Sequence, residues 1–207
     1  MATADTETDD IYRQALEMPK ERGRPFLSQA AKALFDEGDH TAALTLMREY
    51  AEYLENEKGD YGWAKDVVKE SADWCRDVGD PSQASTLLLE LAESFLAAPK
   101  NLTGWAASNF YEGAMCHIET GNVKDATKVL RNAYEKHFKG VNDFHTPWFE
   151  THLAILEDKE TTDDVKLDRL ASDFLLKNRD SWQRSCNMGI AKLARGKKPA
   201  PDSRTTR

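Results

Sequence analysis

The side chains most suited to chemistry in this 207-residue chain belong to three cysteines and five histidines. No H-x-x-x-H, H-E-x-x-H or C-x-x-C spacing occurs. Adjacent Cys116 and His117 would point about 100° apart on a helix, too far apart to share one metal ion readily. The two glycine-rich phosphate-loop patterns, G-x-G-x-x-G and G-x-x-x-x-G-K-[ST], are both absent. We therefore expect no catalytic residue, no metal site and no cofactor.

A cysteine nucleophile activated by histidine is the remaining enzymatic interpretation. It would use Cys75 or Cys116, and the adjacency of Cys116 to His117 is its only support. Nothing near either cysteine favours a thiolate, and a cysteine in a helix is more commonly buried. An enzyme is thus the least favoured class.

Basic side chains recur at one spacing in three segments of the chain. Each lies five residues after an alanine: Arg48 after Ala43, Lys69 after Ala64, and Arg131 after Ala126. Lys65 would share a helix face with Lys69, and Lys128 would share one with Arg131. Stacked helices would align these cations into a row that attracts an acidic helical partner. The alternative is that they are ordinary solvated side chains.

Acidic side chains gather in LAILEDKETTDDVKLD at 153–168. Glu157, Asp158 and Glu160 are expected near the end of one helix, and further aspartates begin the next. This cluster is either a docking patch for a basic partner or a set of carboxylates favoured at a helix N-terminus.

Overall charge argues against nucleic acid as the main partner. The formal net charge is −8. From Lys192 onward the tail sums to +5, which leaves −13 for the body. The tail is either a solubilising end or a contact for an acidic partner or anionic lipid.

Cellular location follows from cysteine spacing and hydropathy. Three scattered cysteines favour a reducing compartment. The acidic start MATADTETDD lacks a signal-like apolar region, and the longest apolar stretch, 86–98, is interrupted by Glu90 and Glu93. We expect a cytoplasmic protein, with peripheral membrane contact left open.

A repeat in the sequence predicts the helices that position these side chains. Similar helix starts at 38–43, 59–64, 79–84, 102–106 and 121–126 end in alanines separated by 21, 20, 22 and 20 residues. In four of them a glycine lies five residues before the alanine and precedes Asp or Asn, which predicts a helix end followed by a new N-cap. Small residues recur eight positions later, where neighbouring helices can approach closely. The repeated alanines are Ala43, Ala64, Ala84, Ala106 and Ala126.

Tryptophan marks every second helix of this pattern. Trp63 and Trp105 precede the repeated alanine in GDYGWAKD and NLTGWAAS, and Trp148 follows. The two-helix unit is therefore about 42 residues, longer than the tetratricopeptide unit that shares its GD-x-x-x-A signature. These tryptophans are expected to be packing wedges between hairpins rather than a site.

The predicted fold is all-α: a tetratricopeptide-like, right-handed helical-hairpin solenoid of about ten helices with a small C-terminal helical bundle. We expect disorder at 1–8 and 197–207, and one repeat domain over 9–196 whose C-terminal bundle covers about 145–196. The expected helices are 9–21, 26–37, 40–57, 61–78, 81–98, 102–120, 122–139, 145–158, 162–177 and 180–195.

Several stretches in order resemble the SNAP family, the soluble NSF attachment proteins. The run from GDHTAALTLMREYAEYL to GDPSQASTLLLELA (38–92) resembles its central hairpins, and EGAMCHIETGNVKDATKVL (112–130) a later one. FETHLAILEDKETTDD (149–164) and NRDSWQRSCNMGIAKLARGKK (178–198) resemble its C-terminal bundle, with a tail closest to the gamma form. The resemblance covers roughly 38–198 and depends on the order of several weak motifs.

The resemblance implies an adaptor that lies along a SNARE helical bundle and presents it to an AAA+ disassembly ATPase in vesicle fusion and intracellular transport. It implies that Lys65, Lys69, Lys128 and Arg131 face the SNARE bundle. It also implies that Glu157, Asp158 and Glu160 face the ATPase, and that Ile190 or Leu193 matches the apolar end of the last helix.

Two departures from the family pattern lie near the ends of the chain. Only GRPFL at 23–27 offers an apolar membrane-contacting loop, and the tail is basic without a terminal leucine. The alternative function is a tetratricopeptide-like scaffold or assembly subunit whose groove binds another protein helix or peptide.

Overall fold

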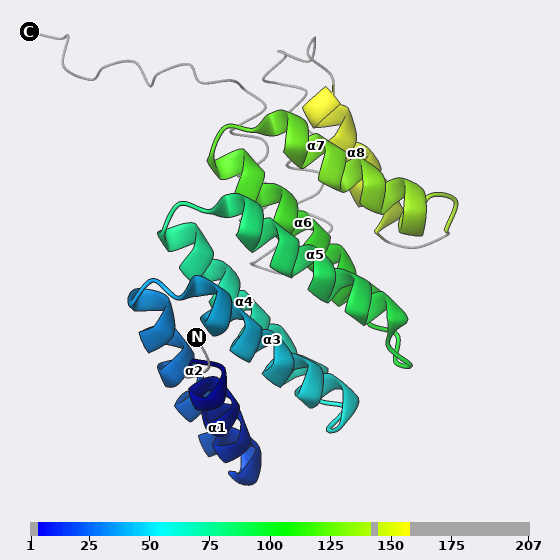
Figure 1. Ribbon diagram of the computed structural model, residues 1–207. Helices are drawn as coiled ribbons and strands as arrows, with labels where there is room; N and C mark the ends of the chain where they lie inside the picture. Colours follow the sequence, from blue (N-terminus) through cyan, green and yellow to red (C-terminus); the bar gives the residue numbers. More distant parts are fainter. Residues whose placement is uncertain (1–3, 142–144, 158–207) are drawn as a thin grey trace, which may run out of the picture. The chain divides into compact units, whose positions relative to one another are not determined.

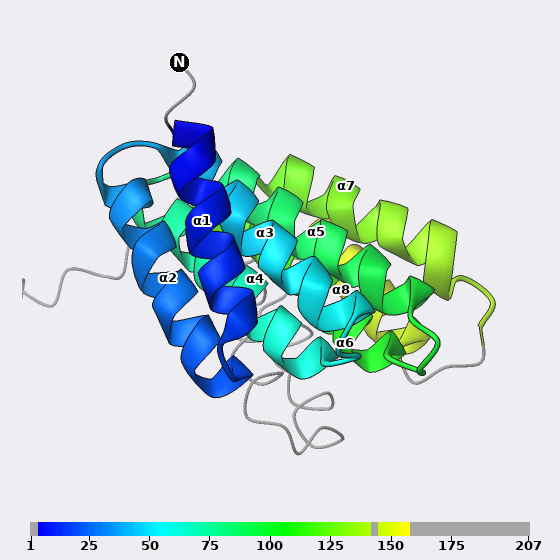
Figure 2. The same cartoon turned by 60° about the horizontal axis from the view of Figure 1, so that its bottom comes forward.

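The computed structural model describes residues 4–141 and 145–157, and within these ranges the chain is helical and contains no strand (Figures 1 and 2). The chain divides into two compact units, Met1–Ala98 and Pro99–Arg207. The elements are α1 (Ala4–Glu17), α2 (Lys20–Asp36), α3 (His40–Asn56), α4 (Tyr61–Asp77), α5 (Pro81–Ala97), α6 (Thr103–Glu119), α7 (Val123–Ala133), the π-helix η1 (Tyr134–Phe138) and α8 (Thr146–Glu157).

The repeated alanines are packing positions, as the sequence predicts. All five have no exposed side-chain surface, and the small residues eight positions later are at most 4% exposed. Alanine at these positions leaves room for the neighbouring helix, and the larger apolar side chains between them fill the remaining core. The later alanines are Ala51, Ala72, Ala92 and Ala114.

A Gly-Asp or Gly-Asn pair joins consecutive helices at four places. At the end of α2, Gly38 has φ +96° and donates to the Phe35 carbonyl, while the Asp39 amide donates to the Leu34 carbonyl. This is the Schellman pattern, which requires a left-handed residue. The Asp39 carboxylate then accepts from the Ala42 amide and caps α3. Asp60, Asp80 and Asn122 cap α4, α5 and α7 in the same way.

The first two helices differ from those predicted. Helix α1 begins at Ala4, so the expectation of disorder over 1–8 is wrong for residues 4–8. Acidic residues there lie at the positive end of the helix dipole, where they stabilise it. Helix α2 begins at Lys20 and continues through Pro25, which was expected at a helix boundary. Proline removes one helical hydrogen bond, but burial of the α2 face that carries Leu27 and Phe35 offsets this loss.

The GRPFL segment is not the loop that the resemblance implies. It lies inside α2, where Leu27 is fully buried. A Cβ atom on Gly23 would lie 2.4 Å from the Ala15 carbonyl oxygen of α1. Glycine is therefore required here by the close approach of two helix backbones.

The C-terminal unit has an aromatic core. Phe138 stacks on Phe149 with ring centroids 4.5 Å apart and meets Phe110 edge to face. One helix was expected over 122–139, but α7 ends at Ala133 and a π-helical turn follows. The wider turn changes the rotation of the following side chains, and Phe138 within it is 1% exposed.

Some predicted elements lie outside the described residues. They are the helices at 162–177 and 180–195 and the basic tail at 197–207, so most of the C-terminal bundle stays a prediction. None of the described helices is both long and apolar enough to span a membrane.

Candidate functional site

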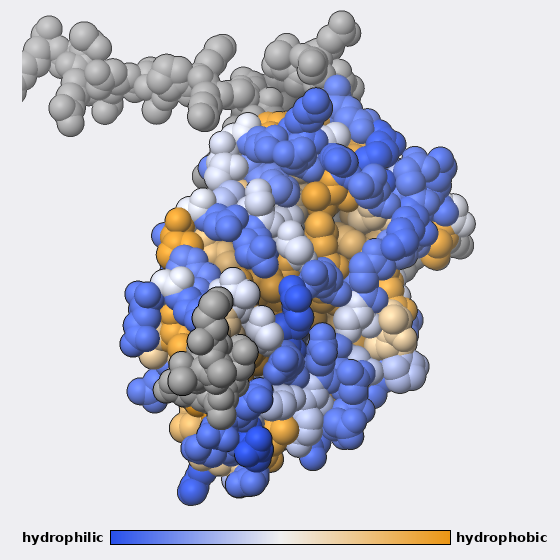
Figure 3. All heavy atoms as spheres, in the orientation of Figure 1, coloured by the Kyte–Doolittle hydropathy of each residue, from blue (hydrophilic) through white to orange (hydrophobic). Residues whose placement is uncertain are grey.

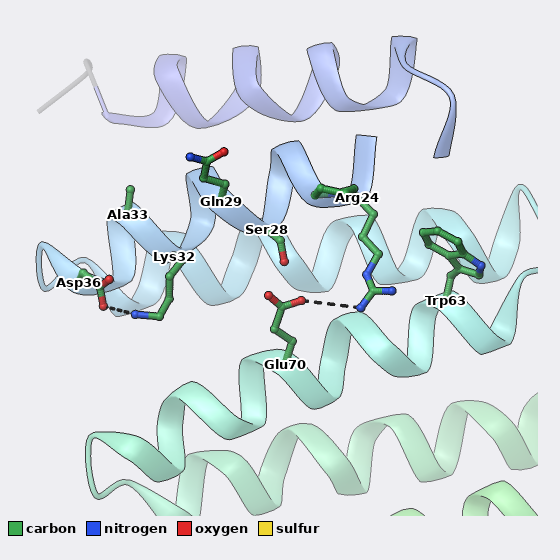
Figure 4. Close-up of a pocket in the computed structure, with 9 residues that line it drawn as sticks. Arg24, Ser28, Gln29, Lys32, Ala33, Asp36, Trp63 and Glu70 are labelled. Carbon is green, nitrogen blue, oxygen red and sulfur yellow. Dashed lines mark hydrogen bonds and ion pairs between the residues drawn. The ribbon is translucent and has the colours of Figure 1, made fainter. Parts of the chain in front are cut away.

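A wide groove lies between α2 and α4 in the N-terminal unit. It has a volume of about 660 Å³ and opens to solvent (Figure 4). Arg24 and Ser28 point into it from α2, and Trp63 and Glu70 face it from α4. Volumes of this size accommodate ligands or short peptide segments.

Arg24 occupies one end of the groove and makes three contacts with α4. Its guanidinium lies 3.6 Å from Asp66, 3.9 Å from Glu70 and 5.2 Å from the centre of the Trp63 ring. Both ion pairs are longer than a hydrogen bond, so the guanidinium is held by charge and by the aromatic face. A partner group that hydrogen-bonds to Arg24 would therefore displace only weak contacts.

An unsatisfied hydroxyl lies midway along the groove, and a second cation lies at its other end (Figure 4). Lys32 pairs with Asp36 one turn further along α2, and its ammonium lies 6.0 Å from the Trp74 ring. The Ser28 hydroxyl oxygen is buried and has no hydrogen-bond partner in the described part of the chain. An unpartnered buried hydroxyl is costly, and a bound polar group or a water can satisfy it.

Local sequence explains how these side chains share one face. Arg24, Ser28, Lys32 and Asp36 follow each other at intervals of four residues in α2. The sequence prediction begins this helix at 26, because proline favours a helix boundary, and so it leaves Arg24 outside the helix and misses this spacing. Reading the helix through the proline would have identified the set.

The tryptophans are not all packing wedges. Trp63 is half-buried beneath Arg24, whereas Trp105 is 39% exposed. The side chain of Trp148 is outside the described part of the chain. The Trp63 ring therefore belongs to the groove as well as to helix packing.

The structure does not gather the predicted basic residues of the N-terminal unit on one face. Lys65 and Lys69 lie on one side of α4, both half-buried. Ser71 comes two residues after Lys69, which is about 200° of helix rotation, so the two side chains lie on roughly opposite sides of α4. Ser71 lines a cleft together with Arg48 of α3. Arg48 thus faces a different surface, where it pairs with Glu90 at 2.8 Å.

The two predicted faces of the C-terminal unit meet each other. Arg131, assigned to the basic face, forms a two-pronged ion pair with Glu157, assigned to the acidic face; its Nε atom lies 3.0 Å from Oε1. The hydrogen bonds that the Arg131 guanidinium donates to the Glu157 carboxylate raise the pKa of Arg131. Lys128 is exposed one turn earlier in α7. Asp158, Glu160, Ile190 and Leu193 lie outside the described residues.

Cysteine and histidine side chains contribute to packing where they are described. Burial raises the pKa of the Cys75 thiol to about 11, and Asp80 adds to this effect. The Cys116 thiol is fully buried and donates to the Glu112 carbonyl at 3.3 Å. His152 is buried edge to face against Tyr111. No described group of three or more His, Cys, Asp or Glu side chains is placed to hold a metal ion.

Comparison with known proteins adds no assignment: no family model matches the sequence, and no curated protein matches it.

Proposed function

We propose that this chain is a helical-hairpin adaptor that binds a helix or peptide of another protein in the α2–α4 groove. The observation that carries the proposal is Arg24 held loosely between Trp63 and two carboxylates at the opening of a 660 Å³ groove. Aromatic and arginine side chains in partly desolvated grooves are the residues that most often dominate protein interfaces.

The chemistry of the groove favours a partner segment with both polar and apolar side chains. Arg24 and Lys32 offer donors to carboxylates or carbonyls, Glu70 accepts from donors, and Trp63 offers an apolar surface. A purely apolar segment would leave these charges desolvated, which is unfavourable.

A SNAP-like adaptor that binds a SNARE helical bundle and links it to an AAA+ ATPase is the second candidate. The resemblance motivates it, and the shared side of α4 that carries Lys65 and Lys69 supports it. On this proposal the protein acts in vesicle transport in the cytoplasm, with peripheral membrane contact.

The first test is a pull-down from cytosol with the full chain at low and at moderate salt, read by mass spectrometry. The general adaptor proposal predicts a partner whose recovery falls for Trp63→Ala and Arg24→Glu. Trp105→Ala is the matched control, because it removes the other Gly-Trp-Ala tryptophan. Equal loss with Trp63→Ala and Trp105→Ala would exclude the groove as the main site.

The SNAP-like proposal predicts recovery of SNAREs together with an AAA+ ATPase, weakening as salt rises. Lys65→Glu with Lys69→Glu should then abolish recovery. This pair is cleaner than one that includes Arg131, whose reversal would also place a second carboxylate beside Glu157. Undiminished SNARE recovery by the double variant would exclude that side of α4.

A further inference from the structure

A second groove lies on another side of α4, with α3 and α5 as its walls. In Figures 1 and 2 these two helices run side by side and cover α4. Two adjoining cavities of about 90 and 380 Å³ share Leu44 and Arg48 as lining residues. The groove therefore follows α3 from Thr41 to Glu55, roughly 20 Å of helix.

The floor of this groove is apolar. Val68 and Cys75 of α4 lie beneath it, and Leu87 and Leu91 of α5 line one wall. Hydrophobic surface is visible between hydrophilic residues on this face of the N-terminal unit in Figure 3. An apolar floor with a charged rim is the usual form of a docking surface for a protein segment.

The rim of the groove is mainly acidic. Arg48 and Glu90 pair across it at 2.8 Å, from α3 to α5. Glu52 and Glu55 line the cavity beyond this pair, without another lysine or arginine among the lining residues. Since Glu90 neutralises Arg48, two carboxylates are left beside an apolar cavity.

Glu55 is the more desolvated of these two carboxylates. It accepts a hydrogen bond from the Ser94 hydroxyl of α5 and is half-buried. Burial raises its pKa above the usual range, and the charge of Glu52 raises it further. A cation placed here would compensate a charge that a neutral hydroxyl compensates only in part.

We propose that the α3–α5 groove is a docking site for an apolar protein segment that carries an arginine or lysine. The apolar side chains of the segment lie on the floor, and its cation pairs with Glu52 and Glu55. Charge complementarity selects this occupant: the N-terminal unit has 21 acidic and ten basic residues, a formal net charge of −11.

The size of the inner cavity limits what enters it. A volume of about 90 Å³ is well below that of pockets for small molecules and accommodates the end of one side chain. The basic residue is thus an anchor, and the rest of the segment lies along the groove. This site is independent of the α2–α4 groove and goes beyond the function proposed above.

Four labelled peptides would test the proposal against the full-length protein by fluorescence anisotropy. Each is about 15 residues long, like the stretch of α3 that the groove follows, and has the same amphipathic Leu-Ala-Ser frame. They differ only at one central position, which is Arg, Lys, Leu or Glu. The Arg and Lys peptides are expected to bind at least about tenfold more tightly than the Leu and Glu peptides.

Variants assign the binding to the groove. Glu52→Gln with Glu55→Gln should weaken the Arg peptide about tenfold, because the amides keep the shape and lose the charge. Glu49→Gln is the matched control, an exposed carboxylate of α3 that does not line the cavity. Val68→Phe should also weaken binding by filling the cavity, with native folding checked by protection of the Cys75 thiol.

The results separate this proposal from the one on the α2–α4 groove. Binding of the Arg peptide that is unchanged by Trp63→Ala and lost with the Glu52 and Glu55 changes supports the α3–α5 site. Equal binding of all four peptides would overturn it. An equal loss of Arg-peptide affinity in Glu49→Gln and in the Glu52→Gln, Glu55→Gln double variant would also overturn it. A loss caused by Trp63→Ala alone would place the peptide in the α2–α4 groove instead.

Discussion

Gly-Trp-Ala occurs in the first turn of α4 in the N-terminal unit and of α6 in the C-terminal unit, with different surroundings. Asp60 caps α4, and Trp63 lies under the Arg24 guanidinium. Helix α6 begins after Leu102 without a side-chain cap, although Asn101 accepts from the Thr103 amide, and Trp105 is 39% exposed. The same three letters thus mark a helix start in both units and a candidate binding residue in only one.

The units differ in charge as well. The N-terminal unit has a net charge of −11, and its core combines alanine and leucine with the buried aromatic side chains of Phe35, Tyr50, Trp74 and Phe95. The C-terminal unit holds 15 acidic and 18 basic residues, a net charge of +3, and an aromatic core with a π-helical turn. A repeat signature therefore predicts where helices begin and leaves their surfaces to diverge.

The largest expected difference between the units is in how a glycine-to-alanine substitution changes the free energy of unfolding. Gly23→Ala should lower the free energy of unfolding by about 3 kcal/mol, because the new Cβ would meet the Ala15 carbonyl at 2.4 Å. Gly104→Ala in α6 meets only His145 at 3.4 Å, so it should be neutral or stabilise by up to about 1 kcal/mol. Chemical denaturation measures both.

The same pair of variants tests whether the units open separately. Cys75 is buried in the N-terminal unit and Cys116 in the C-terminal unit, so thiol labelling reports each of them. With Cys186→Ser as background, Gly23→Ala should speed labelling of Cys75 and leave Cys116 protected. Equal acceleration of both thiols would show that the units unfold together.

The helix starts provide the next largest effect. Asp60→Ala removes the acceptor for the Trp63 amide and should cost about 1 kcal/mol. Asn101→Ala should cost only a few tenths, since Asn101 lies outside the cap position of α6. Thermal unfolding of the two variants measures the difference, and a larger effect at Asn101 would contradict our account of the two starts.

The ion pair between α7 and α8 should contribute less. Arg131 and Glu157 are 41% and 39% exposed, so a double-mutant cycle with alanine should give a coupling energy of about 0.5–1 kcal/mol. The coupling should fall with added salt. A coupling that is unaffected by salt would mean that packing, rather than charge, links the two side chains.

The smallest effects are opposite pH dependences in the two units. Burial raises the pKa of Glu55, so its native state holds the proton more tightly, and stability falls as pH rises from the usual carboxyl range through the raised pKa. Lys139 lowers the pKa of Glu135, so that contribution is present above the usual pKa and is lost as pH falls through the lowered value. Denaturation at several pH values with Glu55→Gln and Glu135→Gln measures each contribution.

Sequence analysis predicted α3, α4 and α5 to within one residue at each end. It missed the first turns of α1 and α2, because it predicts disorder over 1–8 and a helix boundary at Pro25. It also missed Arg24, Ser28 and Lys32, since an incomplete helix hides their four-residue spacing. The errors in α2 share a cause: burial against a neighbouring helix, which local propensity does not contain, outweighs the single unfavourable residue Pro25.

The sequence by itself determined the helix joints and the buried alanines, because the joints depend on interactions within a few residues and the alanines recur at fixed intervals along the chain. A left-handed glycine ends a helix, the following carboxylate caps the next, and small side chains at fixed intervals face the neighbour. Only the tertiary structure decided which charges meet. Arg48 and Glu90 are 42 positions apart, and Arg131 and Glu157 are 26 apart. Exposed pairs contribute too little free energy to leave a pattern in the sequence, so their partners follow from how the helices pack.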